Sequence, residues 1–264
     1  MTLAVELLGT TTKMAICTLV PGQTVYSEAG KFLFCSDDVT MATKLSAPTA
    51  AGGAPAAPGG LGGLLRGVAA AGSRMLAGES LAFTHFTTTG GSGLLGLAGV
   101  LPGEMRAIEL DGRTTWFAEK DAFVAAEAGV AFSIAFSGLR QGLQGGEGFV
   151  LEKFTGTGTL LIGGAGDFVD LNPADFGGRI KVDTGCVVAW DDKITYGVTR
   201  VGGIGNALFG GEGFRLATLE GNGRVILQSV TIAGLAKALA KHMHEGENRT
   251  GGSAIGSIFG SGAG

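Results

Sequence analysis

The chain has 264 residues, of which 50 are glycine, and carries a formal net charge of -4 with only 16% charged residues. This balance argues against a polybasic surface for nucleic acid, which needs clustered Lys and Arg. The glycines lack the every-third-residue spacing of collagen, so we expect them at turns between short strands. Cys17, Cys35 and Cys186 are widely separated, which favours free thiols in a reducing compartment over a zinc knuckle or a disulfide framework.

The amino terminus has neither the basic start nor the apolar core of a signal peptide. The longest apolar stretch, 61–76, contains Arg66 and Arg74 and is diluted by glycine. We therefore expect no transmembrane segment and a cytoplasmic location.

In chain order, the first recurring segment has two apolar runs on either side of a polar turn. Its copies are GKFLFCSDDVTMAT from Gly30, DAFVAAEAGVAFSI from Asp121 and TGCVVAWDDKITYG from Thr184. This pattern predicts a β-hairpin in each copy.

A second segment recurs more clearly, as GESLAFTHF from Gly78, GEGFVLEKF from Gly146 and GEGFRLATL from Gly211. In this alignment Leu81, Phe149 and Phe214 are equivalent. Each copy continues through a glycine-rich tip into another apolar run, which again predicts a hairpin.

Together the segments predict an all-β fold of three tandem β-sandwich-like units of about 65 residues, which can close around a pseudo-threefold axis. Unit 1 spans 1–99, unit 2 spans 100–165 and unit 3 spans 166–230. Unit 1 carries an Ala-, Pro- and Gly-rich insertion at 46–73, which is either a surface loop or a segment that contacts a partner or a membrane.

The pattern changes after unit 3. Residues 231–244 predict a C-terminal helix with Ile232, Leu235 and Leu239 on one face, which caps the β units or packs on another subunit. Residues 245–264 are rich in Gly and Ser, and we expect a flexible tail there.

Glu79, Glu147 and Glu212 recur at the Gly-Glu segments and are the candidate binding residues. If they face a common axis, three carboxylates converge and need a cation or raised pKa values. The simpler interpretation, which we favour, is that each accepts hydrogen bonds from backbone N–H groups of the preceding glycine loop.

The remaining polar residues predict no catalytic, metal or cofactor site. His85 is expected at an outward strand position without a nucleophile or an orienting carboxylate. His242 and His244 stand two apart on a helix, which is the wrong spacing for a zinc pair. The pairs Asp37-Asp38 and Asp191-Asp192 fit turn chemistry better than calcium binding.

The three Gly-Glu segments, LPGEMRAIEL from Leu101 and GRVILQSV from Gly223 resemble one family over residues 1 to 230. It comprises bacterial proteins of unknown function related to the altered inheritance of mitochondria protein 24. The resemblance implies three units like the trp RNA-binding attenuation protein around a pseudo-threefold axis, usually in a homo-oligomer. It implies no catalytic residues, and the eukaryotic members are associated with mitochondrial inner-membrane organisation.

The leading hypothesis is a non-enzymatic oligomeric scaffold that assembles with itself and reaches a membrane only through an unknown protein partner. The alternative is a binding module for a small ligand or nucleic acid, with its site between β units. A hydrolase is the third and weakest hypothesis.

Overall fold

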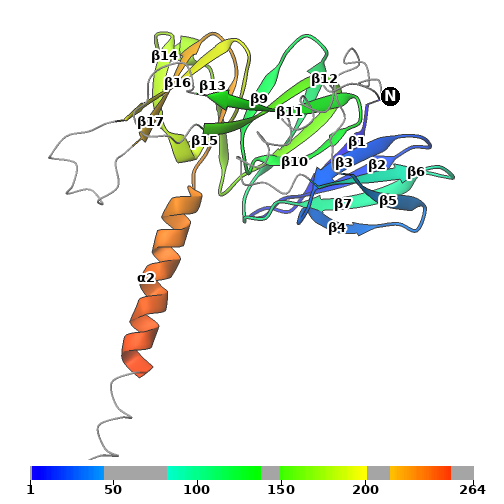
Figure 1. Cartoon of the computed structure of the whole chain (residues 1–264), viewed down its shortest axis with the longest axis horizontal. Helices are drawn as coiled ribbons and strands as arrows, with labels where there is room; N and C mark the ends of the chain where they lie inside the picture. The colour runs from blue at the N-terminus through cyan, green and yellow to red at the C-terminus, as the bar shows by residue number, and fades with distance from the viewer. Residues whose placement is uncertain (1, 45–81, 138–148, 201–214, 251–264) are drawn as a thin grey trace, which may run out of the picture. The chain divides into compact units, whose positions relative to one another are not determined.

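The computed structural model describes residues 2–44, 82–137, 149–200 and 215–250 (Figure 1). The fold is mostly β, with several antiparallel sheets and one C-terminal helix, as predicted. Met1–Ser229 and Val230–Gly264 form two separate compact domains. The insertion at 46–73 and residues 251–264 lie outside the described residues.

The strands follow one another closely through the β domain. Those in 1–99 are β1 (Ala4–Leu8), β2 (Met14–Leu19), β3 (Thr24–Glu28), β4 (Phe32–Cys35), β5 (Val39–Lys44), β6 (Phe83–Thr88) and β7 (Gly93–Ala98). Those in 100–165 are β8 (Met105–Asp111), β9 (Trp116–Glu119), β10 (Phe123–Glu127), β11 (Val130–Ser137) and β12 (Phe149–Gly163). Those in 166–230 are β13 (Phe168–Leu171), β14 (Arg179–Asp183), β15 (Val187–Asp191), β16 (Ile194–Arg200), β17 (Arg215–Gly221) and β18 (Val225–Gln228), with 3-10 turns η1 (Pro173–Phe176) and η2 (Thr184–Cys186).

Four antiparallel ladders occur in the same arrangement in each of the three ranges. The first joins β5 to β6, β11 to the first half of β12, and β16 to β17. The second joins β3 to β6, β9 to that half of β12, and β14 to β17. The third joins β2 to β7, β8 to the second half of β12, and β13 to β18. The fourth joins β4 to β7, β10 to the second half of β12, and β15 to β18, with a register shift at the same place each time.

These ladders also share one register. In the second ladder Val25 lies opposite Phe86, Trp116 opposite Phe154, and Ile180 opposite Leu219. Phe86, Phe154 and Leu219 are the residues that the Gly-Glu alignment makes equivalent. Positions in the three ranges can therefore be compared strand by strand.

The predicted Gly-Glu hairpins are wrong, because the two runs of each segment do not pair with each other. β6 and β7 belong to different sheets, and so do β17 and β18. In the middle copy both runs form the single strand β12, in which Gly156 and Gly158 have φ of +103° and +128°. Glycine at these angles bends the strand from one sheet into the next without reversing the chain.

The other predicted hairpin is wrong in the same way. β4 pairs with β7, whereas the next strand, β5, pairs with β6. β10 and β11 pair with opposite halves of β12. Each polar turn is thus a corner at which the chain passes from one ladder to another, as in packings where strands change sheets.

Two further antiparallel ladders join consecutive ranges. β10 pairs with β3 at what we call the first junction, and β15 pairs with β9 at the second junction. The largest core cluster crosses both junctions, since it contains Tyr26 and Phe83, Phe123 and Phe154, and Ile226. A closed pseudo-threefold ring needs a third ladder, between β14 and β4. In the described strands β14 pairs only with β17 and β4 only with β7, so that closure stays a prediction.

The helix α2 (Ile232–Thr250) runs six residues beyond the predicted end at 244. Thr231 caps its start, because its hydroxyl accepts a hydrogen bond from Gly234 N at 3.0 Å. Ile232 and Leu239 are exposed on the expected apolar face. Within the described part of the chain, no helix combines the length and apolar character needed to cross a bilayer.

Candidate functional site

The three glutamates singled out from the sequence, Glu79, Glu147 and Glu212, lie outside the described residues. Neither their convergence nor their hydrogen bonding is tested. The candidate site is therefore built from features of the β domain that the structure describes: two strand edges, one pocket, and a set of buried acceptors.

The β4 edge exposes three consecutive apolar side chains. Phe32, Leu33 and Phe34 are 42%, 47% and 45% exposed. The fourth ladder makes them equivalent to two apolar runs of the same length on β10 and β15. Those six residues are between 0% and 2% exposed: Phe123, Val124, Ala125, Val187, Val188 and Ala189.

The burial of β10 and β15 has a simple cause. Each of them lies between two strands: β10 between β12 and β3, and β15 between β18 and β9. Among the described strands β4 has a neighbour on one side only, β7. Its apolar side chains, unlike those of β10 and β15, are exposed.

The β14 edge is the counterpart of β4 at the other end of the domain. Val182 of β14 is half-buried, whereas the equivalent Ala118 and Ser27 are buried at the two junctions. Ile180 is also half-buried, whereas the equivalent Trp116 and Val25 are buried. Within the part of the chain that the structure describes, β14 therefore lacks the second neighbour that β3 and β9 have.

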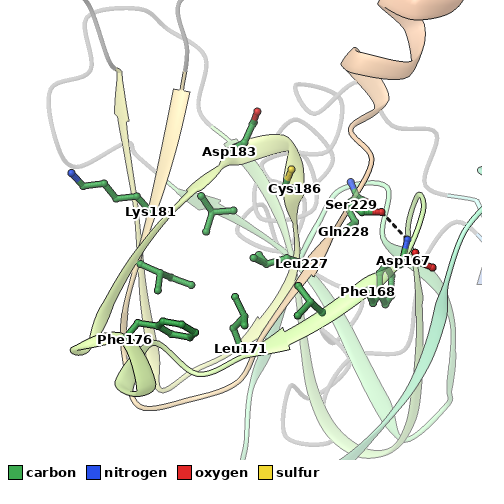
Figure 2. Close-up of a pocket in the computed structure, with 13 residues that line it drawn as sticks. Asp167, Phe168, Leu171, Phe176, Lys181, Asp183, Cys186, Leu227, Gln228 and Ser229 are labelled. Carbon is green, nitrogen blue, oxygen red and sulfur yellow. Dashed lines mark hydrogen bonds between the residues drawn. The ribbon is translucent and has the colours of Figure 1, made fainter.

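A pocket with a volume of about 510 Å³ opens beside β14 (Figure 2). Its lining is mainly apolar and comes from β13, η1, β14 and β18: Phe168, Val169, Leu171, Phe176, Ile180, Val182 and Leu227. Phe176 is 58% exposed, so the wall on the η1 side is itself open to solvent. This lining suits an apolar group better than a charged one.

Hydrogen bonds fix the polar rim of the pocket. Asp167 N donates to Ser229 Oγ at 2.9 Å, the bond drawn in Figure 2. Gln228 Nε2 donates to Gly185 O at 2.8 Å. Burial, and next the nearby Asp183, raise the pKa of the Cys186 thiol, so it stays protonated and is a poor nucleophile at neutral pH.

Side chains that accept a backbone hydrogen bond recur at the carboxyl ends of β4, β10 and β15, and the sequence reasoning missed them. Ser36 Oγ accepts from Leu94 N at 3.0 Å. Glu127 Oε2 accepts from Thr159 N at 2.7 Å, and Asp191 Oδ2 from Arg224 N at 2.8 Å.

These three acceptors occupy equivalent positions, and so do their donors. Glu127 and Asp191 are both almost fully buried, and Glu127 Oε1 also accepts from Gln23 Nε2 at 2.7 Å. The sequence did hold a signal for them: Ser36, Glu127 and Asp191 are side chains with acceptor oxygens, one in each copy of the first recurring segment. Each of these side chains ties the end of one strand to the backbone of the strand it pairs with.

The second junction carries a titratable pair. Tyr196 Oη on β16 donates to Glu119 Oε1 on β9 at 3.5 Å. Burial raises the pKa of Glu119 to about 7; the Tyr196 hydrogen bond opposes this shift, and the nearby Asp121 adds to it.

An ion cluster joins the same two ranges. Asp170 on β13 accepts from Arg224 Nε at 2.7 Å and also binds Arg106 on β8. Burial opposes ionisation of Asp170, but hydrogen bonds from Arg224 and Arg106 outweigh it and lower the pKa of Asp170. Arg224 lies over the Trp116 ring, 5.7 Å from its centroid.

Two other expectations can be checked. The outward position predicted for His85 is wrong: it is 6% exposed and stacks on Tyr26 with centroids 5.8 Å apart. Turn chemistry is confirmed for Asp191, whose Oδ1 accepts from Lys193 N at 3.1 Å. Among the described residues, no three His, Cys, Asp or Glu side chains are grouped so as to hold a metal ion.

Comparison with known proteins adds the family. The family model described as mitochondrial biogenesis AIM24 matches residues 5–230. An X-ray crystal structure of a protein from Streptococcus pyogenes is similar, with 26% identity and a TM-score of 0.66, over 91% of this chain and 98% of that one. No curated protein matches. These findings confirm the resemblance noted in the sequence, and the chain belongs to the mitochondrial biogenesis AIM24 family.

Proposed function

We propose that this chain is a non-enzymatic scaffold that assembles with itself. The observation that carries the proposal is the exposed apolar edge of β4, at Phe32, Leu33 and Phe34. An apolar strand with a free edge is a template for another strand, and soluble proteins normally cover or charge such edges. Assembly covers it.

The proposal includes the internal triplication expected from the sequence. It is supported by the four ladders and the common register that recur in the three ranges. A pseudo-threefold arrangement, and the likeness to the trp RNA-binding attenuation protein, both require each unit to contact its neighbour in the same way. The two junctions agree with this requirement, because both pair equivalent strands.

The non-enzymatic part of the proposal is supported by how the buried carboxylates are used. Glu127 and Asp191 already accept backbone hydrogen bonds, and Asp170 is held by two arginines. The family name ties relatives to mitochondrial biogenesis, and for this chain we propose an organising role in the cytoplasm, with a membrane reached through a protein partner.

Size-exclusion chromatography with light scattering tests self-assembly on the full chain at micromolar concentration. We expect a mass that is a multiple of 26.4 kDa. Phe34→Asp should lower that mass. Val100→Asp is the matched control, because Val100 is 68% exposed but lies outside every strand. A wild-type chain that stays monomeric would refute the proposal.

The pocket beside β14 favours a second candidate function, binding of a small apolar ligand. Its lining and volume fit such a ligand, although all lining residues come from 167–229 and not from two units. Native mass spectrometry of the purified chain is the test: a bound molecule that is lost in Val182→Asp supports it, and an unliganded chain opposes it.

A further inference from the structure

We propose that the outer edge of β14 in one copy pairs antiparallel with the outer edge of β4 in a second copy, with Val182 opposite Phe34. This inference rests on the proposed self-assembly and names the two surfaces that make it. It follows from the junctions that the chain builds twice within itself.

The internal junctions supply the register. At the first junction Ala125 lies opposite Ser27, Ala126 opposite Tyr26, and Glu127 opposite Val25. At the second junction Ala189 lies opposite Ala118, Trp190 opposite Phe117, and Asp191 opposite Trp116. The two registers are the same when β3 and β9 are aligned by their ladders to β6 and β12, and β10 and β15 by their ladders to β12 and β18.

The same alignment fixes the register of a third junction. Phe34 is equivalent to Ala125 and Ala189, because all three follow the register shift of the fourth ladder. Val182 is equivalent to Ser27 and Ala118 through the second ladder. The third junction therefore places Phe34 opposite Val182, Cys35 opposite Lys181, and Ser36 opposite Ile180.

Burial separates these two edges from the other free edges of the domain. The outer edges of β5, β11 and β16 pair with no described strand in any of the three ranges, so the comparison of ranges gives no missing partner for them. Of the described strands, only β4 and β14 lack a neighbour that both of their equivalents have. Their apolar residues, exposed on β4 and half-buried on β14, stand at positions that the first two junctions bury.

At both junctions, one more backbone hydrogen bond joins the residue pair next to the last paired residues of the ladder. Ala128 N donates to Thr24 O at 2.9 Å, and Asp192 N donates to Thr115 O at 2.9 Å. Asp192 Oδ2 also accepts from Thr115 N at 3.0 Å. The equivalent pair at the third junction is Asp37 and Arg179.

Charge at the two edges is complementary in this register. Asp37 lies opposite Arg179 and diagonal to Lys181, within reach of both long side chains. Asp37, Arg179 and Lys181 are all exposed in the single chain. A lysine on an edge strand discourages pairing with strands that have no negative charge nearby. Lys181 therefore favours a partner strand with a carboxylate beside it, such as Asp37 beside β4.

This contact is heterologous, since it uses a different edge from each copy. It takes the place of ring closure within one chain, which would use the same two edges of β4 and β14. Repeated head to tail, it gives a closed ring or a filament, in contrast to the twofold dimer of a self-complementary patch. It also covers Val182 and Ile180 and narrows the pocket beside β14.

The test uses a native cysteine. Directly opposite residues in antiparallel strands have Cα atoms about 4.5 to 5.5 Å apart, a separation that a disulfide spans. We expect Lys181→Cys to form a disulfide with Cys35 of the next copy under mild oxidation, giving a ladder of dimers, trimers and higher species on non-reducing gels. Cys17 does not interfere, because burial, with a further contribution from Glu127, raises the pKa of its thiol to about 12.

Three further variants show whether a cross-link comes from the proposed β14–β4 contact. Val182→Cys should give no ladder, because adjacent strand residues point to opposite faces. Lys181→Cys with Cys35→Ser and Cys186→Ser should also give none; a dimer that persists there means that two β14 edges meet, and it overturns the inference. Phe34→Cys with Val182→Cys provides a second in-register pair in case Lys181→Cys perturbs folding.

The inference and the function it rests on fail separately. If light scattering shows an oligomer but neither in-register pair cross-links, the copies meet elsewhere and only this inference falls. If light scattering shows a monomer, the proposed self-assembly falls with it. An internal disulfide in a monomeric Lys181→Cys chain would mean that the two edges close a ring within one chain, and it overturns the inference.

Discussion

Trp190 of β15 lies directly opposite Phe117 of β9, and their rings stack with centroids 6.0 Å apart. Trp190 also stacks on Tyr196 at 4.5 Å, with the two ring planes 10° apart. The second junction is therefore held by a column of three aromatic rings. At the first junction the same two positions hold Ala126 and Tyr26.

Removal of the central ring should destabilise the fold. Trp190 is 2% exposed, so we expect Trp190→Ala to lower the free energy of unfolding by about 3–5 kcal/mol. Phe117 is only half-buried, and Phe117→Ala should cost clearly less. Urea unfolding followed by circular dichroism measures both. Equal losses for the two variants would show that the column is not centred on Trp190.

Glu119 should make stability depend on pH. Its pKa is about 7 in the folded chain against its ordinary value of 4.5, so the folded state binds more protons between these values. Stability is then highest below about pH 4.5 as far as this group is concerned, and falls by up to about 3 kcal/mol as pH rises through 7.

Glu119→Gln should remove this loss, because the amide oxygen still accepts from Tyr196 and carries no charge to desolvate. The measurement is the free energy of unfolding at pH 5, 6, 7 and 8. We expect the wild-type chain to lose stability over this range relative to Glu119→Gln. Parallel profiles for the two proteins would contradict the shifted pKa.

The composition and the recurring segments were enough to predict an all-β fold with a C-terminal helix. They could not show which strands pair. Two apolar runs with a polar turn between them look the same in sequence whether the two strands pair as a hairpin or join different sheets. The strands they pair with, which lie far away in the sequence, determine which of the two forms. β4 and β5 are such a case, because their partners β7 and β6 lie more than 40 residues away.

The site was harder to predict than the fold. Phe32, Leu33 and Phe34 have the composition of a buried strand, and their equivalents on β10 and β15 are buried. Their exposure goes with the lack of a second neighbour among the described strands, and no local pattern records how many neighbours a strand has. The prediction for His85 failed for a related reason. Its ring is covered by Tyr26, which lies on the neighbouring strand β3 but far away in the sequence.

Glu127 should stabilise the first junction through its two hydrogen bonds. Glu127→Ala leaves the Thr159 N–H without its acceptor in a buried site and releases Gln23, at a cost of about 1–3 kcal/mol. Glu127→Gln keeps an acceptor for Thr159 N and should cost less. Hydrogen exchange at Thr159 reports the bond directly: protection that survives in Glu127→Ala would show that another group holds this amide.

Gly156 should not tolerate a side chain. Its φ is +103°, and a Cβ there would overlap the carbonyl oxygen of Gly129. Gly156→Ala should therefore lower the free energy of unfolding by more than the roughly 1 kcal/mol of an ordinary strained glycine. Gly197 on β16 is the control, since a Cβ there meets nothing within 4 Å. Similar thermal midpoints for Gly156→Ala and Gly197→Ala would show that the bend in β12 can relax.

Variants that disable one edge each should complement one another if the copies meet head to tail. Phe34→Asp disables β4 and leaves β14 intact, while Arg179→Glu with Lys181→Glu places like charges near Asp37 and disables β14. Each protein alone should be monomeric by light scattering. Mixed in equal amounts, they should form a one-to-one dimer and nothing larger, because one working β4 edge and one working β14 edge remain. A self-complementary interface cannot be rescued by mixing in this way, so monomers in the mixture would point to a twofold contact or to a different surface.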